Sequence, residues 1–457
     1  MTCRLRTEKI CRMKWTYLLL VAACISSPLY AQTNATLSLQ AALQYGLSNS
    51  PAARSAQLEI DIARTLIGQA GSLALPQLSV QANYTRLDEL TEIDLGEGAI
   101  DLGTLDNYEV SAQVSQVLYA GGQVGAAWRA ARIARAYAAA NRDAFEAALT
   151  FEISRLFYAV LLAREAVEVQ QASLEMLQQF ELQARDRKDG GAASEFDALT
   201  AQVRVANARP ALIAAQNELA LTQAALANAI HYKEEFEVEG TLDITLVLWQ
   251  KYELELMALQ QRQQLQAARF MADLARENVT GAKSAGRPEV RLFANTMGGN
   301  ANQFDFSDDW DWRWTAGVTA RWNLWDGNLT RQTVRQREIE LRQQQYYVAE
   351  QESAILLQVK QAWLTLQQAQ ESLAASAESV ALAQRALQIA QTRYDAGLST
   401  YLELTDANLA LRTAELARLQ AKHDHAVARA QVRFAVGLPS PYLSNPNLVE
   451  NHEKESL

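Results

Sequence analysis

The chain contains one internal duplication, and this feature constrains its fold more than any other. Ile62-Ala63-Arg64 corresponds to Leu274-Ala275-Arg276 at an offset of 212 residues. From about residue 118 onward the offset is 206, and Gly191–Ala201 matches Gly397–Ala407 at that spacing. Repetition on this scale indicates that a whole structural unit is present twice. The offset changes once, between two candidate strands of each unit, where a loop tolerates a difference in length.

Each unit is expected to begin with a helical stretch. We place the first unit at residues 32–232 and the second at 252–437, with the opening helices at 39–73 and 252–286. The whole chain has only 8 prolines and 20 glycines. Because these residues interrupt helices, their scarcity favours long uninterrupted helices throughout.

Two strands are expected to follow in each unit. They lie at residues 77–86 and 108–118 in the first unit, and at 289–297 and 312–324 in the second. Apolar and polar side chains alternate most clearly in 312–324, which is the period of a strand with two unlike faces. Strands of about ten residues with aromatic residues near their ends fit a transmembrane barrel. A half-buried sheet in a soluble domain would alternate in the same way.

A very long helical hairpin is expected to complete each unit, at residues 123–232 and 328–436. The outgoing helix of either hairpin would be on the order of 100 Å long. Apolar residues recur every seven positions along it, which is the coiled-coil period. They are Ile153, Val160, Val167 and Leu174 in the first hairpin, and Val359, Leu366, Leu373, Val380, Leu387 and Tyr394 in the second.

Residues 1–31 have the layout of a secretory signal, with a basic start, an apolar run and small residues at the end. Cleavage after Ala31 is expected, although Cys24 stands in a lipoprotein-like box and Met13 is an alternative start. The three cysteines all lie in this segment, so no disulfide is expected in the remaining chain.

The rest of the chain has two further segments and an acidic balance. Residues 233–251 are expected to form a small mixed segment outside the bundle, and 438–457 a flexible tail. Removing five basic and one acidic residue of the signal from 42 Lys+Arg and 52 Asp+Glu leaves a net charge of −14. This charge argues against nucleic-acid binding.

The strand number predicts an assembly. Four strands cannot close a barrel, and open sheet edges are not tolerated in lipid. Two copies would give an eight-stranded barrel, and side chains fill the interior of a barrel of that size. Three copies give twelve strands and leave a pore. The expected fold is therefore mainly α-helical, with a trimeric 12-stranded transmembrane β-barrel continued by a periplasmic coiled-coil tunnel.

Several motifs resemble those of TolC-like outer membrane efflux proteins. They are Ser38-Leu39, Ala41-Ala42-Leu43, Ser50-Pro51, Leu75-Pro76-Gln77-Leu78, Gly121-Gly122, Arg393-Tyr394-Asp395-Ala396-Gly397-Leu398-Ser399-Thr400, Leu402-Glu403-Leu404 and Asp406-Ala407. The resemblance extends from about Leu39 to Gly437. The second unit departs from it at Arg262-Gln263, where a proline like Pro51 would be usual.

The resemblance implies a homotrimeric conduit in the cell outer membrane, in contact with its lipid and with a large periplasmic part. It implies no catalytic activity and no cofactor. It implies docking to a periplasmic adaptor (membrane fusion) protein, and through it to an inner-membrane pump of the RND, ABC or MFS class, in a tripartite efflux or type I secretion system. The cargo is not indicated. The rival interpretation is that the chain is itself a periplasmic adaptor, which would carry one hairpin and no aromatic-flanked strands.

The resemblance also assigns roles at the hairpin ends. The adaptor-contacting tips correspond to Gly191, Ala192, Ala193 and Ser194, and to Gly397, Leu398, Ser399 and Thr400. Asp197, Glu403 and Asp406 match acidic positions at the narrow pore entrance, where copies would form rings that attract cations. These acids could equally be a solvated face stabilised by a helix N-terminus. Tyr394 is expected to hydrogen-bond Asp197 of a neighbouring hairpin, and Ser399 stands where the family has a linking arginine.

No other motif predicts chemistry. His423 and His425 lie two apart on a helix and point to opposite sides, so a shared metal is not expected. The acid-rich segments between the strands of each pair are expected to be solvated loops. No nucleophile–base pair or phosphate-binding loop is found, which argues against an enzyme.

Overall fold

The computed structural model describes most of the chain after the signal segment. The described residues are 35–94, 99–102, 104–242, 245–300, 310–439 and 441. The predicted signal at 1–31 and nearly all of the predicted tail at 438–457 lie outside them.

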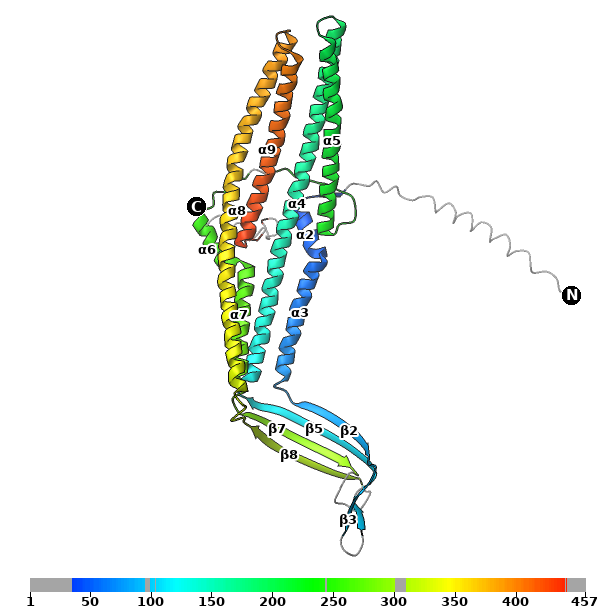
Figure 1. The fold of residues 1–457 in the computed structure, drawn as a ribbon, viewed down its shortest axis with the longest axis vertical. Helices are drawn as coiled ribbons and strands as arrows, with labels where there is room; N and C mark the ends of the chain where they lie inside the picture. The colour runs from blue at the N-terminus through cyan, green and yellow to red at the C-terminus, as the bar shows by residue number, and fades with distance from the viewer. Residues whose placement is uncertain are drawn as a thin grey trace, which may run out of the picture.

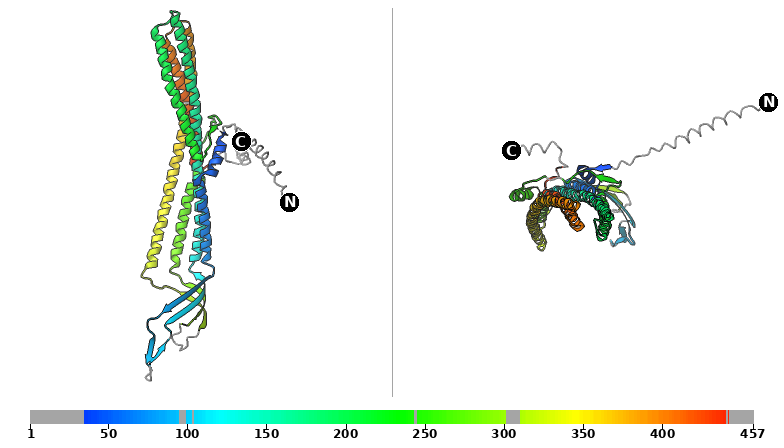
Figure 2. Two further views of the ribbon diagram at one scale, coloured as in Figure 1. Left: turned by 90° about the vertical axis from the view of Figure 1, so that its right-hand side faces the viewer. Right: turned by 90° about the horizontal axis from the view of Figure 1, so that it is seen from above.

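The molecule is elongated, with two long helical hairpins standing on one sheet (Figure 1). Seen from above, the helices form a curved layer that is hollow on one side (Figure 2). Within the described residues, no helix is long and apolar enough to cross a membrane.

The sheet contains four antiparallel strands in the order β2-β5-β7-β8. They are β2 (Gln77–Arg86), β5 (Asp106–Ala120), β7 (Glu289–Gly299) and β8 (Asp311–Arg321). β5 is longer than predicted at both ends, whereas β8 ends three residues before the predicted boundary of 324. The Trp322 indole donates to the Gly286 carbonyl at 3.1 Å, which directs the chain toward the turn before β7. A short hairpin, β3 (Thr91–Asp94) and β4 (Ala99–Leu102), stands where a plain loop was expected.

Aromatic and aliphatic side chains on the outer strands are exposed in the single subunit. Trp314 is 79% exposed, and Val80 and Val318 are similarly open. Phe293, which breaks the alternation of β7, pairs with Gly317 on β8, and its ring fills the space beside that glycine. The out-of-phase Phe293 is therefore accommodated by the glycine on the neighbouring strand, and not by a change within β7 itself.

The two hairpins are equal in length. Their outgoing helices, α4 (Gln123–Asp189) and α8 (Leu329–Asp395), have 67 residues each. The returning helices, α5 (Glu195–Ile230) and α9 (Tyr401–Val436), have 36 each. This equality agrees with the constant offset of 206 across both hairpins. The predicted heptad positions are largely buried, including Val160, Val359 and Leu366.

Each opening helix is broken into two, which corrects the predicted single helices at 39–73 and 252–286. The first unit has α2 (Leu39–Asn49) and α3 (Pro51–Ser72), and the second has α6 (Lys251–Gln261) and α7 (Gln263–Ser284). The Ser50 hydroxyl accepts from the Ala53 amide at 3.3 Å, and Pro51 follows at the first helical position, so a new helix starts there. Arg262 is extended at the matching break.

The broken helices complete a continuous wall. α3 and α7 line the half of the long helices nearest the sheet, while α5 and α9 line the other half (Figure 1). Around the curved layer the order is α8, then α9 and α7, then α4, then α5 and α3.

A small sheet at the middle of the molecule was not predicted. β1 (Ala35–Leu37) pairs in parallel with β6 (Phe236–Val238), which lies in the predicted segment 233–251. Phe236 and Val238 are buried against Phe157 and Leu161 of α4. This contact joins the start of the described chain to the connection between the two units.

Arg262 is only 3% exposed at the break between α6 and α7. Its guanidinium donates to the Phe434 carbonyl near the end of α9 and to the side-chain oxygens of Gln264 and Gln358. It also lies 4.2 Å from the centre of the Phe434 ring. Burial lowers the pKa of Arg262 to about 10, which leaves the group charged at neutral pH. The cation therefore stabilises the C-terminal end of α9 and joins it to α7 and α8.

Gly121 provides a first prediction, with Gly327 as its matched control in the second unit. Both have positive φ, +61° and +66°, but a Cβ at Gly121 would lie 2.7 Å from the Ser284 carbonyl oxygen, whereas nothing lies within 4 Å at Gly327. Gly327→Ala is expected to cost about 1–2 kcal/mol for the left-handed backbone. Gly121→Ala is expected to cost roughly 1–3 kcal/mol more, because backbone must shift. Thermal unfolding in detergent, followed by circular dichroism, measures the difference; equal melting temperatures would contradict the close approach.

Candidate functional site at the hairpin tips

The two tips use the same turn. Gly191 and Gly397, in the turns after α4 and α8, have φ of +76° and +74°, a conformation that favours glycine. The Ala192 amide donates to the Arg187 carbonyl at 2.7 Å, and the Leu398 amide donates to the Arg393 carbonyl at 2.8 Å. These bonds close the helix ends as Schellman motifs. All eight residues predicted for adaptor contact lie in or directly beside these two turns.

A hydroxyl side chain caps the N-terminus of each returning helix. The Ser194 hydroxyl accepts from the Asp197 amide at 3.1 Å, and the Asp197 carboxylate accepts in return from Ser194. In the second hairpin, the Thr400 hydroxyl accepts from the Glu403 amide at 3.4 Å. Asp197 and Glu403 thus occupy equivalent places in the first turn, where a negative charge is stabilised by the helix N-terminus.

An apolar cluster joins the two tips within the subunit. Tyr394 and Tyr401 of the second hairpin are 4% and 2% exposed, and their ring centres lie 6.1 Å apart. The cluster draws on all four hairpin helices and contains Leu174, Leu177, Phe180, Ala184, Ala201, Val205, Ala208, Tyr394, Tyr401 and Leu404. The hairpins therefore touch through large side chains near their ends rather than through glycine or alanine alone.

Arg187 is a tip residue that the sequence analysis missed. From the last turn of α4 it donates to the Tyr394 carbonyl at 2.6 Å and to the Asp395 carbonyl at 3.1 Å. Its guanidinium lies 4.2 Å from the centre of the Tyr394 ring and 3.6 Å from the Asp395 carboxylate. The available signal was the repeat, which aligns Arg187 with Arg393 of the motif.

Tyr394 lies beside Arg187 in the subunit, and Asp197 is near enough for its charge to act on the Tyr394 hydroxyl. Burial raises the pKa of its hydroxyl, the positive charge of Arg187 opposes this, and the negative charge of Asp197 adds to it. The carboxylate of Asp197 is bonded to Ser194 in the subunit, and the expected bond from Tyr394 stays a prediction. Burial raises the pKa of Tyr401 to about 12, so both tyrosines are neutral.

The acids of the second tip are exposed. Glu403 faces solvent, and Asp406 is 62% exposed at 3.9 Å from the Arg204 guanidinium of the first hairpin. A pair this exposed contributes little to stability. Both carboxylates therefore stay available to ions in solution, with Arg204 offsetting part of the charge of Asp406.

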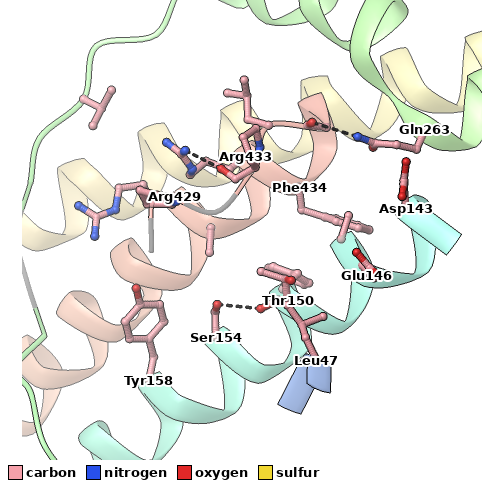
Figure 3. Close-up of a pocket in the computed structure, with 18 of the residues that line it drawn as sticks. Leu47, Asp143, Glu146, Thr150, Ser154, Tyr158, Gln263, Arg429, Arg433 and Phe434 are labelled. Carbon is pink, nitrogen blue, oxygen red and sulfur yellow. Dashed lines mark hydrogen bonds between the residues drawn. The ribbon is translucent and has the colours of Figure 1, made fainter. Parts of the chain in front are cut away.

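A cavity of about 590 Å³ lies at the middle of the molecule, on the order of 50 Å along α4 from the tip. Asp143 and Glu146 of α4 form one wall, and Arg429, Arg433 and Phe434 of α9 lie opposite (Figure 3). None of the predicted site residues lines it. Among the described residues, no group of three or more His, Asp or Glu side chains is arranged to hold a metal ion.

The sequence matches the family described as outer membrane efflux protein over residues 42–230 and 256–438, one match to each unit. The chain belongs to this family. It is a channel component of an outer membrane efflux system, with a large periplasmic part, and the interpretation as a periplasmic adaptor is not favoured. The family is one of channels rather than of enzymes, and its members work as homotrimers with pump partners.

Solved structures of outer membrane channels have the same fold. The outer membrane protein VceC of Vibrio cholerae has a TM-score of 0.73 at 21% identity, over 87% of this chain and 96% of that one. The open state of the MtrE channel of Neisseria gonorrhoeae has a TM-score of 0.71 at 20% identity, over 88% of this chain and 89% of that one. The CmeC channel of Campylobacter jejuni has a TM-score of 0.71 at 15% identity, over 92% of this chain and 89% of that one. A sequence search of curated proteins gave no match.

Proposed function

We propose that this efflux protein is a passive conduit whose three subunits share one 12-stranded barrel and one helical tunnel. The two outer strands of the sheet, each with one edge unpaired, support this proposal. Within the described residues, β2 and β8 are each paired on one side only. Because an open edge in lipid leaves backbone groups without partners, β8 of one subunit would pair with β2 of the next.

The helices support the same arrangement. α9 packs between α8 and α4, but the outer flanks of α5 and α8 each expose apolar side chains. Leu199, Val203 and Leu221 of α5 are more than half exposed, as are Leu357 and Leu382 of α8. The repeat places α5 beside the α8 of a second copy, just as α9 lies beside α4. Exposed apolar flanks of this kind are typical of subunit interfaces.

The hairpin tips are proposed to dock a periplasmic adaptor, which connects the tunnel to an inner-membrane pump. Apart from the exposed Leu398, the turns at Gly191 and Gly397 are built from small residues and backbone, so another helical hairpin can approach closely. Whether the pump is of the RND, ABC or MFS class, and whether the cargo is a drug, a metal or a protein, depends on that partner.

The exposed acids of the second tip are proposed to line the entrance. Three copies each of Glu403 and Asp406 would form rings of negative charge, with Asp197 close by on the first hairpin. Such rings favour cations and bind multivalent cations that block the pore. The link from Tyr394 to Asp197 belongs to the same closed entrance.

Membrane fractionation tests the trimer. The protein is expected in outer-membrane detergent extracts, running as a trimer on gels when unheated and as a monomer after boiling. In planar bilayers the purified trimer is expected to conduct KCl. Recovery as a soluble monomer from the periplasm would contradict the proposal.

A further inference from the structure

The four-stranded sheet has one apolar face and one polar face, and its register shows which residues belong to each. Residues directly opposite one another on neighbouring strands lie on the same face. One such row is Leu78, Val114, Ala294 and Ala316, and the next row is Ser79, Gln113, Asn295 and Thr315. In the proposed barrel the apolar rows face lipid, so the polar rows face the pore. This inference therefore rests on the proposed trimer.

The charged residues of the polar face form two layers. The inner layer lies at the end of the sheet nearest the helices, and the outer layer lies at the far end (Figure 1). The inner layer is Glu289, Arg291 and Arg321, and the outer layer is Glu109, Asp311 and Arg313. Within these four strands, the rows of the polar face between the two layers carry no charged side chain. Each subunit therefore contributes a net charge of +1 to the inner layer and −1 to the outer layer.

In the inner layer one acid serves two arginines. The Arg291 guanidinium donates to the Glu289 carboxylate at 2.5 Å, and both residues lie on β7. Arg321 on β8 stands directly opposite Glu289 in the register, and it is exposed. Because the only carboxylate of this layer already accepts from Arg291, the layer keeps an excess positive charge on the pore side.

The surroundings of the inner layer add to this charge. The segments that join the sheet to the helices contain one basic and one acidic residue, Arg287 and Asp326, which cancel. The twelve residues of each helix next to the sheet contain eight basic and five acidic residues, a net charge of +3. These residues are 61–72, 123–134, 273–284 and 329–340. The junction of sheet and helices thus has a net charge of +4 per subunit, whereas residues 32–457 together have −14.

The charge of the inner layer acts across the whole pore. Twelve strands spaced about 4.8 Å apart and tilted by about 40° enclose a backbone radius of about 12 Å. Arginine side chains reach inward from that wall, and the Debye length at 0.1 M salt is about 10 Å. An anion anywhere in this cross-section therefore lies within about one Debye length of a guanidinium group.

We propose that three copies each of Arg291 and Arg321 form a binding site for multivalent anions inside the pore, where the barrel joins the tunnel. Guanidinium groups bind sulfonate, carboxylate and phosphate oxygens through paired N–H donors, so a cargo that carries several such groups is the ligand class. The proposed entrance rings are negative and the inner layer is positive. Anionic groups are therefore drawn from the entrance toward the junction. The outer layer is negative again, which confines the site to the inner end of the barrel.

Binding of pyranine, a fluorescent trisulfonate, to the detergent-purified trimer of the full chain tests this site. Fluorescence anisotropy in about 0.1 M KCl measures the affinity. Arg291→Gln with Arg321→Gln is expected to weaken binding at least about tenfold, and Arg321→Gln alone at least about threefold, because positive charges are removed. Glu289→Gln is expected to strengthen binding a few-fold. Arg313→Gln is the matched control, since it lies on the same strand and face about 26 Å away, and a change below about twofold is expected.

The number of bound probes locates the site. One arginine-dependent site per trimer is expected, because one trivalent anion neutralises the combined charge of three inner layers. Three independent sites per trimer would place the anions on the outside of the molecule, near the lipid head groups, and would overturn the proposal. Unchanged affinity in the double variant, or an equal loss in Arg313→Gln, would also overturn it. A chain that forms no KCl-conducting trimer would instead contradict the proposed function, whereas a conducting trimer without arginine-dependent binding contradicts the anion site alone.

Discussion

Replacing Arg262 with alanine is expected to destabilise the protein by about 3–5 kcal/mol per subunit. The guanidinium is buried and bonds to acceptors on three helices, at Phe434, Gln264 and Gln358. Its removal leaves the side-chain oxygens of Gln264 and Gln358 without this donor, at roughly 1–3 kcal/mol for each that water cannot reach, while the Phe434 carbonyl keeps its bond from the Gly437 amide. It also removes the packing over the Phe434 ring. Thermal unfolding in detergent, followed by circular dichroism, measures the loss.

Two further variants separate charge from geometry. Arg269→Ala removes an arginine from the same helix whose pair with Glu352 is exposed, so a loss below about 1 kcal/mol is expected. Arg262→Lys keeps a positive charge but cannot spread donors over three helices, so an intermediate loss is expected. If Arg262→Ala unfolded at the same temperature as Arg269→Ala, the buried arginine would not be what joins α7, α8 and α9.

Replacing Glu403 with glutamine and Asp406 with asparagine in one chain is expected to abolish block by multivalent cations. In the trimer this double change removes six negative charges, three from each of two neighbouring rings, and the attraction of each charge for a trivalent ion adds to the others. The affinity for hexamminecobalt(III) is expected to fall by at least about 100-fold, or roughly 3 kcal/mol. This affinity is measured from the single-channel current at a series of blocker concentrations.

Arg204→Ala is expected to act in the opposite direction. Its guanidinium lies 3.9 Å from the Asp406 carboxylate, so its removal exposes the full charge of that acid to the blocker. Tighter block is therefore expected, by a few-fold for an exposed pair. Asp273→Asn, a half-exposed acid in the middle of α7, serves as the control and should leave block unchanged. Unaltered block in the double variant would show that these acids are a solvated helix face instead of an entrance ring.

Local features of the candidate site could be predicted because local chain chemistry determines them. Gly191 and Gly397 are required by the left-handed turns, and Ser194 and Thr400 are typical helix-capping residues. The partners of Arg187 and Arg262 could not be predicted in this way. Arg187 bonds to residues more than 200 positions away, and Arg262 to Phe434 at a separation of 172. Neither contact leaves a periodic or local trace in the sequence.

The breaks in the opening helices could be predicted in one unit but not in the other. Ser50-Pro51 is a clear signal for a helix start, although the scarcity of proline and glycine favoured one helix over 39–73. At Arg262 no such signal exists, and the break depends on the side chain turning inward to reach the end of α9. The small sheet of β1 and β6 was missed because three-residue strands carry too little pattern to detect.

The sequence by itself determined the architecture of this efflux protein: two equal units, each with a strand pair, a long hairpin and a capped turn at its tip. Periodicity, glycine placement and helix caps act over a few residues, and duplication copies them, so all of these features can be read along the chain. The sequence also made the two tips unequal, with Tyr394, Glu403 and Asp406 in the second and only Asp197 in the first. Only the tertiary structure decided which contacts join the tips. Packing brought Arg187 against Tyr394 and Asp395 and placed Leu177 and Phe180 in one buried cluster with Tyr401. Those contacts depend on which helix flanks meet in space, and residues far apart in the chain create them.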